Sequence, residues 1–585
     1  MTLIRLPPSR PRRRPQELSV AADESAPLST LLPLGLQHAA MALGLSAYVL
    51  ALAKGAHFGV EETRTLLAVS IITMALGTGL QAWGGRLGSG ALIVHIPGPL
   101  LVTQAAPILS VTGPGGMTVL SVACALVALL VAPLTTRLRG LFPPIVAGLV
   151  VLIGGISLIQ SAITHAAGLD AAMAPDGDSL AIAAVTLGLI IGLSIWGSRR
   201  LKLFSLLIGI LGGVVTALLL GRLSGGEALA SVPVVALPAI VAPVFDVPVG
   251  ALIAVAFVAL LVQIDAIGSF ILMDRMDDAD WRRPDMKQAG RGILAAGIGD
   301  FLGGLLGGMA TATSSANIGL CHASRATTRY AGLVAAGLLL VIAFLPQVTM
   351  ALTLIPTPVI GAIELYSAAF LIAAGVDLVA SRQLDTRGVF IIGLSLVCGI
   401  SVLLMPGIAA QAPPSLHHLV GSGFIVTGAL AITLNQLFRL GIRQSETRAI
   451  SPSGPAVSHQ VTDFIERMGG TWAARRDIVR RAAQAAVEAV EAIAAAGCGR
   501  RVTAIGGRFD ELNFDIDLWH DGPPLPLSGA AAPDLANILD GADDEAIDTA
   551  IANVSNVLVQ RLADRLKCGS DPAGGRSFMR LHFDH

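Results

Sequence analysis

The sequence predicts an all-α polytopic membrane domain over residues 31–441 and a soluble α+β domain over residues 459–585. Three observations support this division. Residues 31–441 form a near-continuous series of apolar stretches, each about 20 residues long, the length of helix that crosses roughly 30 Å of hydrocarbon. The chain is 54% hydrophobic and only 14% charged, whereas soluble domains carry about 25% charged residues. The composition becomes polar after Arg443.

We expect fourteen membrane spans, two of them short and broken. They lie near residues 31–53, 64–84, 90–109, 117–135, 141–163, 179–196, 202–221, 249–273, 291–308, 309–322, 330–347, 350–375, 388–406 and 417–438. The broken spans are 90–109, which Pro97, Gly98 and Pro99 interrupt, and 309–322, which is short and rich in Thr, Ser and Gly. Segment 231–246 contains three prolines, and we expect an interfacial or extracellular excursion there.

The distribution of positive charge supports this count. If residues 1–30 form a basic cytoplasmic tail, the alternating loops on the same side hold nearly all of the Arg and Lys residues, and the opposite loops hold only Lys54, Arg64 and Arg222. This is the positive-inside rule, and it predicts that both termini are cytoplasmic. The tail lacks the short apolar core of a secretory signal.

Fourteen spans divide into two sets of seven, and the second set then enters the membrane with the opposite orientation. The broken span is the third of each set. A pair of interrupted spans at matching positions in two inverted repeats is the best sequence indication of a transporter site. The alternative is that both are ordinary spans kinked by Gly and Pro.

Composition also excludes several classes of function. The net charge of −1 gives no indication of a nucleic-acid partner. Five scattered cysteines without a CxxC pair favour neither a disulfide framework nor a zinc site. Because no catalytic triad spacing, metal cluster or phosphate loop is present in the sequence, we do not expect an enzyme.

Polar residues inside the apolar spans are costly and therefore indicate function. Asp265 lies deep in the span LLVQIDAIGSFILM, where a carboxylate is retained if it pairs, binds substrate or relays a proton. Gln263 is expected to serve packing or interhelical contacts. Gln37 and His38 lie in the first span, and His38 could be a neutral hydrogen-bonding group or a proton carrier.

The stretch GGLLGGMATATSSANIGLCHASR (303–325) adds hydroxyl and amide groups at the second broken span. The hydroxyls and the amide of this stretch, with backbone groups freed by the helix break, could hydrogen-bond a flat polar ligand; they belong to Thr311, Thr313, Ser314, Ser315 and Asn317. The alternative is small-residue helix packing. Asp300 is expected near a membrane interface.

Four motifs carry a resemblance to a known family. LPLGLQHAAMALG (32–44), QIDAIGS (263–269), ANIGLCHASR (316–325) and DTRGVFIIGLSLVCGI (385–400) resemble the first-span, eighth-span, signature and thirteenth-span motifs of the nucleobase–ascorbate transporters, the nucleobase:cation symporter-2 (xanthine/uracil permease) family. The resemblance covers about residues 30–441.

The resemblance implies a seven-plus-seven inverted repeat with substrate between the third and tenth spans. It implies a secondary active transporter, a symporter driven by H⁺ or Na⁺ and with no other cofactor, of a planar solute such as uracil, xanthine or urate. The implied partners are this small molecule and the lipid bilayer of the plasma or inner membrane, with a homodimer as one arrangement. The implied substrate-binding residues are Asp265, Asn317, Gln37, His38, Ala316, Gly319 and Ser315, of which Asp265 and His38 would couple protons.

Two positions depart from the family pattern. Ala316 replaces a Gln or Glu that holds the base in many members, and Ser324 replaces the signature Thr. The first change removes one directional contact, so the nucleobase preference is expected to be atypical.

The segment 442–458 is expected to be a linker, and the domain at 459–585 to contain a helical region over 463–496, strands at 501–508 and 511–519, a helix at 543–567 and a closing strand. This pattern resembles the ATPase fold of anti-sigma-factor and histidine kinases. Glu488 corresponds to an acidic nucleotide-box residue, but Ala492 replaces its Asn partner, and Asp521-Gly522 matches only a fragment of the second box. We therefore expect a regulatory or dimerising module without ATP.

Two other functions stay open. A sulfate-permease-type anion carrier has the same architecture and often a cytoplasmic domain, although anions favour helix N-termini and basic residues over Asp265. A membrane sensor that signals through the C-terminal domain is the second alternative.

Overall fold

The computed structural model contains two compact units. One comprises Met1–Val379 with Ile391–Thr433, and the other comprises Ala380–Phe390 with Leu434–His585. The structure describes residues 6–9, 12–135, 143–169, 173–198, 201–202, 204–223, 226–281, 285–380, 384, 386–405, 407, 411–413, 416–438, 444–451, 456–472, 474–495, 500–510, 513–525, 558–570 and 576–584.

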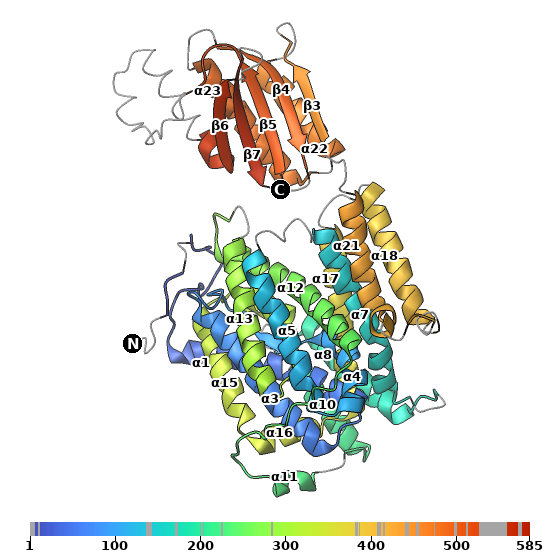
Figure 1. Ribbon diagram of the computed structural model, residues 1–585. Helices are drawn as coiled ribbons and strands as arrows, with labels where there is room; N and C mark the ends of the chain where they lie inside the picture. Colours follow the sequence, from blue (N-terminus) through green and yellow to red (C-terminus); the bar gives the residue numbers. More distant parts are fainter. Residues whose placement is uncertain are drawn as a thin grey trace. The chain divides into compact units, whose positions relative to one another are not determined.

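The membrane domain is helical apart from two short strands (Figure 1). Its elements are α1 (Leu28–Leu45), α2 (Ala47–Gly55), α3 (Val60–Trp83), β1 (His95–Pro97), α4 (Pro99–Thr112), α5 (Gly116–Val131), η1 (Ala132–Leu134), α7 (Pro144–Ala167), α8 (Gly177–Trp196), α10 (Ser205–Leu219), α11 (Glu227–Ser231), α12 (Val249–Asp277), α13 (Met286–Leu305), β2 (Thr311–Thr313), α14 (Ser315–Ser324), α15 (Arg329–Ala343), α16 (Pro346–Thr353), α17 (Thr357–Ala380), α18 (Thr386–Leu404), α20 (His417–Val420) and α21 (Gly423–Phe438).

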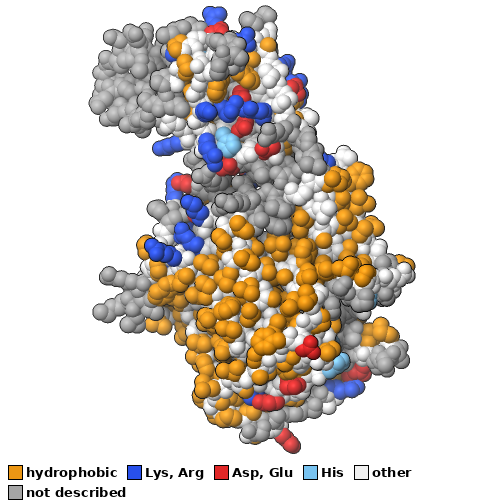
Figure 2. Space-filling model, in the orientation of Figure 1, with side chains coloured by type: hydrophobic (Ala, Val, Ile, Leu, Met, Phe, Trp, Pro, Cys, Tyr) orange, Lys and Arg blue, Asp and Glu red, His pale blue; other side chains and the backbone are white. Residues whose placement is uncertain are grey.

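The outer surface of these helices is suited to a bilayer. Among the described residues, eight helices are long and apolar enough to cross a membrane, or nine if α15 and α16 are counted as one bent span. Figure 2 shows hydrophobic side chains over most of the visible face of this unit, with charged side chains towards its ends. Large apolar residues such as Trp196 and Leu219 are 80% and 81% exposed, an exposure that suits a surface facing lipid. The prediction of a polytopic membrane domain is confirmed.

Two span boundaries differ from the prediction. The first span is divided at Ser46 into α1 and α2. The eleventh bends by 86° between α15 and α16, and α16 ends at Thr353. The expected span 350–375 therefore contains a break before Pro356, since proline lacks the amide hydrogen that a continuing helix needs. Residues 232–248, between α11 and α12, contain no helix, in agreement with the three prolines of this segment.

The basic tail packs along the membrane domain. Val20 forms a parallel bridge with Ala326, and the backbone nitrogen of Thr327 donates to the Val20 carbonyl at 2.9 Å. Arg12, with a side chain 6% exposed, lies 3.5 Å from Asp277 and 4.0 Å from Asp274 at the end of α12. Part of the sequence predicted as a basic tail is thus fixed to the ends of α12 and α14.

The two broken spans meet through their strands. β1 pairs with β2 in antiparallel register, with His95 opposite Thr313 and Pro97 opposite Thr311. Each strand is followed directly by a half-helix, α4 after Gly98 and α14 after Ser314. The prediction that 90–109 and 309–322 are interrupted helices is confirmed, and the antiparallel pairing means that α4 and α14 leave the crossing in opposite directions.

Small residues allow helices to approach closely around this crossing. A Cβ atom at Gly299 of α13 would lie 3.0 Å from the Cα atom of Gly77 on α3, and one at Gly77 would lie 2.8 Å from the His95 ring. Only glycine fits at both positions, in agreement with the small-residue packing typical of membrane helices.

The C-terminal unit is an antiparallel sheet covered on one face by two helices (Figure 1). The strand order is β3-β4-β5-β7-β6. The elements are β3 (Gln444–Ala449), α22 (Val457–Thr471), α23 (Arg476–Ala495), β4 (Val502–Phe509), β5 (Asn513–His520), β6 (Arg565–Ser570) and β7 (Ser577–Asp584). Phe464 of α22 packs with strand residues Phe514 and Phe583, and all three are fully buried.

Three boundaries of this unit differ from the prediction. The expected linker contains β3, which pairs with β4, so the folded domain begins at Gln444. The helical region 463–496 is two helices, α22 and α23. Residues 565–567, expected at the end of a helix, belong to β6, and residues 543–557 lie outside the described residues. The paired strands at β4 and β5 and the closing strand β7 are confirmed.

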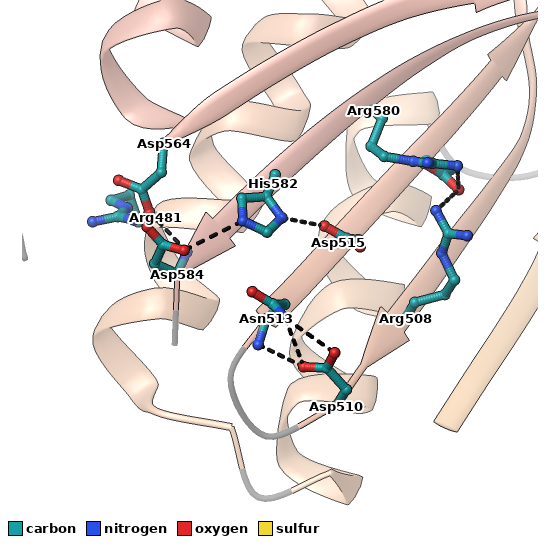
Figure 3. Close-up of polar contacts among 10 residues, drawn as sticks. Arg481, Arg508, Asp510, Asn513, Asp515, Asp564, Arg580, His582 and Asp584 are labelled. Atoms are coloured by element: carbon teal, nitrogen blue, oxygen red, sulfur yellow. Dashed lines mark hydrogen bonds and ion pairs between the residues drawn. The ribbon is translucent and has the colours of Figure 1, made fainter. Parts of the chain in front are cut away.

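The opposite face of this sheet carries cross-strand ion pairs (Figure 3). Asp515 lies opposite His582, and Asp517 opposite Arg580. The His582 ring contacts Asp515 at 2.6 Å and Asp584 at 3.3 Å. Directly opposite charged pairs of this kind fix the register of neighbouring strands.

Candidate functional site

The site is built around the crossing of β1 and β2. The amide of Gly98 donates to the Ala310 carbonyl at 3.0 Å, and the amide of Ser314 donates to the Val94 carbonyl at 3.0 Å. These bonds hold the N-termini of α4 and α14 at opposite ends of one short strand pair. The first amides of a helix have no partner within that helix and carry its partial positive charge. The crossing therefore presents first-turn amides of both half-helices within a small volume, except at Pro99, which has no amide hydrogen, and at Asn317, whose amide donates to the Ser314 hydroxyl.

Asp265 lies in the middle of α12 on the side that faces this crossing. Its carboxyl is half-buried and makes no hydrogen bond or ion pair with the described residues. Ser269, one turn further along the same helix face, accepts a hydrogen bond of 2.9 Å from the hydroxyl of Thr313 in β2. The shared face places Asp265 beside the strand crossing with an acceptor group that the protein does not use.

Asn317, in the first turn of α14, is hydrogen-bonded to His38 of α1 on the buried face of α14. The Nδ1 atom of His38 lies 2.8 Å from Oδ1 of Asn317, and both residues are 1% exposed. The Asn317 amide nitrogen donates to the Ser314 hydroxyl at 3.0 Å. An amide oxygen can only accept, so His38 donates from Nδ1. The structure brings the two residues together, and their contact with substrate stays a prediction.

The open face of α14 is formed by other members of the predicted set. Ser315 and Gly319 are exposed and one helical turn apart, and a Cβ atom at Gly319 would have no neighbour within 4 Å. Ala316 is half-buried against the core. The side-chain oxygen of Gln37 is buried and has no hydrogen-bond partner among the described residues. Buried polar atoms are normally satisfied, so Gln37 has an acceptor left for a ligand.

Four residues outside the implied substrate-binding set hold the crossing in place. The Thr311 amide and hydroxyl both donate to Oδ1 of Asp300, at 2.9 and 2.6 Å. The same hydroxyl lies 2.8 Å from Nδ1 of His95. Because the Thr311 proton points to Asp300, His95 must donate from Nδ1, and its Nε2 accepts from the Gln81 amide at 3.1 Å. The network links α13, β2, β1 and α3.

Asp300 was expected near a membrane interface, and its depth in the membrane stays a prediction. Its side chain belongs to this network and is 2% exposed. The sequence signal was present, since Asp300 lies within an apolar Gly-rich run, where a carboxylate is costly unless paired. What the sequence lacked was the identity of the partner, which lies on β2. Gln263 is 4% exposed and donates to the Ala259 carbonyl of its own helix.

The family comparison agrees with this geometry. The permease family model for xanthine and uracil permeases matches residues 29–408. The chain belongs to the xanthine/uracil permease family. Members of this family are transporters, so the chain is a permease and not an enzyme.

Several curated relatives of this permease cover most of its membrane domain. It is 28% identical over 444 residues to the xanthine permease XanP of Escherichia coli strain K12, covering 72% of this chain and 95% of the relative. It is 26% identical over 419 residues to the uric acid permease PucK of Bacillus subtilis strain 168, covering 70% and 95%. The family match ends before β3, so it does not extend to the C-terminal sheet.

Among solved structures, this permease is similar to the murine Solute Carrier 26 family member A9 anion transporter in the inward-facing state. The TM-score is 0.51 at 12% identity, over 74% of this chain and 72% of that chain. At this identity the likeness shows a shared fold and carries no statement about substrate.

Proposed function

We propose that this permease is a proton-coupled symporter of a nucleobase or similar planar solute such as xanthine, urate or uracil. The observation that carries the proposal is the half-buried Asp265, which has no partner among the described residues and lies beside the paired half-helices of a permease fold. The names of the relatives, a xanthine permease and a uric acid permease, support an oxopurine as the first substrate to test.

The chemistry of an oxopurine matches the groups at the crossing. Such a base carries ring N–H donors and carbonyl acceptors on its edge. The Asp265 carboxylate and the Gln37 carbonyl would accept from N–H groups, and backbone amides at the starts of α4 and α14 would donate to carbonyl oxygens. A site that hydrogen-bonds a particular edge strongly rejects analogues without it, because its own buried groups are then unpaired.

Proton coupling would follow from the negative charge of the Asp265 carboxylate. A carboxylate in a site that closes away from water is costly, and a proton taken up with the substrate would remove that cost. His38 is in place to respond through Asn317 and α14, since its Nδ1 proton is already committed to Asn317. We take H⁺ rather than Na⁺ as the coupling ion, with no other cofactor.

For the membrane topology we propose fourteen spans arranged as two inverted sets of seven. Each predicted segment contains a helix, and the strand-plus-half-helix is the third segment of each set, β1–α4 and β2–α14. The Arg and Lys distribution supports cytoplasmic termini in the plasma or inner membrane. One bundle would rock against the other around the fixed site. A homodimer and a regulatory role for the C-terminal unit are part of this proposal.

The experiment is counterflow in proteoliposomes that hold the purified protein. Vesicles preloaded with unlabelled xanthine should accumulate radiolabelled xanthine, and external urate or uracil should compete, while sulfate and bicarbonate should not. Competition by the anions alone would favour the anion-carrier alternative. Ligand-dependent binding without any counterflow would favour the sensor alternative.

A further inference from the structure

A second polar cluster lies on α7, α17 and α2, apart from the strand crossing. Nδ1 of His165, near the end of α7, lies 2.8 Å from Oε2 of Glu364 on α17. The Glu364 side chain is fully buried and the His165 side chain is 17% exposed. The other carboxyl oxygen of Glu364 is buried and has no hydrogen-bond partner among the described residues. Among the described residues, the one hydrogen-bonded neighbour of this carboxyl is the partly exposed His165.

The helices that carry this pair are packed backbone to backbone. A Cβ atom at Gly361, one turn before Glu364, would lie 2.7 Å from the Cα atom of Ala166 and 2.7 Å from the carbonyl carbon of His165. The contact between α7 and α17 thus depends on the absence of a side chain at Gly361. Because the two helix segments are fixed against each other, the His165–Glu364 bond has little freedom to separate.

The opposite side of Glu364 faces a different helix. Tyr48 of α2 lies beside Glu364 and beside Ser367, which is one turn after Glu364 on α17. The Ser367 hydroxyl donates to the Ile363 carbonyl at 2.8 Å. Tyr48 and Ser367 are 3% and 4% exposed. Tyr48 and Ile363, the residue before Glu364, belong to the same buried core, so α2 lies beside this part of α17.

The other ionisable groups near the cluster are few. Tyr366 lies near Glu364 on α17, and the described groups beyond the end of α7 are Asp176 and Asp178, which both pair with Arg222. No Lys or Arg neutralises Glu364 among the described ion pairs. The charge of the cluster is set by His165 and Glu364.

The protonation of such a pair depends on its access to water. With one shared proton the pair has no net charge, as imidazolium and carboxylate or as imidazole and carboxylic acid. Loss of that proton leaves one negative charge on a fully buried carboxyl, which costs several kcal/mol away from water. A change in the access of water to the free oxygen of Glu364 would therefore change the balance between these two charge states.

We propose that His165 and Glu364 form a second proton-exchange site of the transport cycle, distinct from Asp265, which couples protonation to the closing of α2 against α17. The inference rests on the proposed function for its link to transport. α2 follows directly after α1, which carries Gln37 and His38. A movement of α2 would therefore be transmitted through α1 to the proposed substrate site. A proton enters from water to the Glu364 carboxylate, and the net charge of the pair changes from −1 to 0.

The test compares wild type with Glu364→Gln in proteoliposomes, with radiolabelled xanthine. Without a pH gradient, both proteins should show counterflow within about twofold of each other. With an imposed inward proton gradient, wild type should accumulate xanthine, and Glu364→Gln should lose at least tenfold of that accumulation. His165→Gln should behave like Glu364→Gln, Glu364→Asp should recover part of the accumulation, and the exposed loop variant Asp246→Asn should match wild type.

A second readout does not need transport. Hydrogen exchange of residues 48–55 and 357–367 should increase as pH rises in wild type and be independent of pH in Glu364→Gln, after correction for intrinsic exchange. Full gradient-driven accumulation in a folded Glu364→Gln protein overturns the inference. If wild type shows no counterflow, the proposed function fails, and the exchange profile alone decides whether the pair responds to protons. Equal profiles in the two proteins overturn the inference in that case as well.

Discussion

Nδ1 of His38 lies 2.8 Å from Oδ1 of Asn317, joining positions 279 residues apart in the chain. The first helix is thereby tied to the half-helix that begins at Ser315. Because both side chains are 1% exposed, the bond acts first on the position of α14. The bond therefore fixes the buried face of α14, whose opposite face carries the exposed Ser315 and Gly319.

The His38–Asn317 bond is expected to stabilise the fold. Asn317→Ala leaves the His38 donor buried and unpaired, at a cost of about 1–3 kcal/mol. His38→Ala should cost a similar amount, and the double variant should cost less than the sum of the two, because the second change removes an already broken bond. Thermal unfolding of the detergent-solubilised protein measures this cycle. If the stability losses of the two single variants add up to the loss of the double variant, the bond contributes nothing to stability.

We expect Thr311 to contribute more to the stability of the fold than Thr313, the other threonine of β2. Thr311→Val removes hydroxyl bonds to Asp300 and His95 and leaves both buried, at a cost of about 2–4 kcal/mol. Thr313→Val is the matched control, because it removes one bond to Ser269 and should cost about 1 kcal/mol. Unfolding temperature and radioligand binding report the difference. Equal losses would mean that the Asp300 network does not hold the crossing.

Arg12 and Arg13 are adjacent, but their side chains should contribute very different amounts to the stability of the protein. Arg12→Ala leaves Asp274 and Asp277 without their cation at a site where the side chains are nearly inaccessible, and about 3 kcal/mol should be lost. Arg13 pairs with Asp280, and both side chains are more than 60% exposed, at 70% and 61%, so Arg13→Ala should change nothing measurable. Thermal unfolding compares the two variants. A stable Arg12→Ala protein would contradict the role of the tail in holding α12.

The C-terminal sheet should lose stability as pH rises. The hydrogen bond and charge of Asp515, with Asp584, hold the pKa of His582 above its usual value (Figure 3). A raised pKa means that the contribution is fully present below the unfolded value of about 6.5 and disappears as pH rises through the folded value. Hydrogen exchange of β5 and β7 in the full chain, corrected for intrinsic rates, should become faster over this range.

His582→Gln should remove this pH dependence, while the exposed control His459→Gln should retain it. An unchanged profile in His582→Gln would assign the effect to another group.

The sequence predicted the membrane domain, both broken spans and several C-terminal strands, because length, hydropathy and interrupting Gly and Pro residues act locally. It did not predict which polar groups meet. His95, Thr311 and Asp300 come from three segments, and no local pattern records their register. The strand β3 was also missed, since its six residues are exposed and polar and an edge strand lacks the alternation of a half-buried one. Among the predicted site residues, the sequence could not distinguish the buried His38 and Asn317 from the open Ser315 and Gly319.

The most direct test of the central claim is proton-driven xanthine uptake by Asp265→Asn, with Asp246→Asn as a matched control in an exposed loop. The substitution keeps the size of the side chain and removes its charge and its capacity to take up a proton. We predict that Asp265→Asn is expressed and folded but loses both gradient-driven uptake and xanthine binding, while Asp246→Asn behaves as wild type. Unchanged proton-driven uptake by Asp265→Asn would contradict the account.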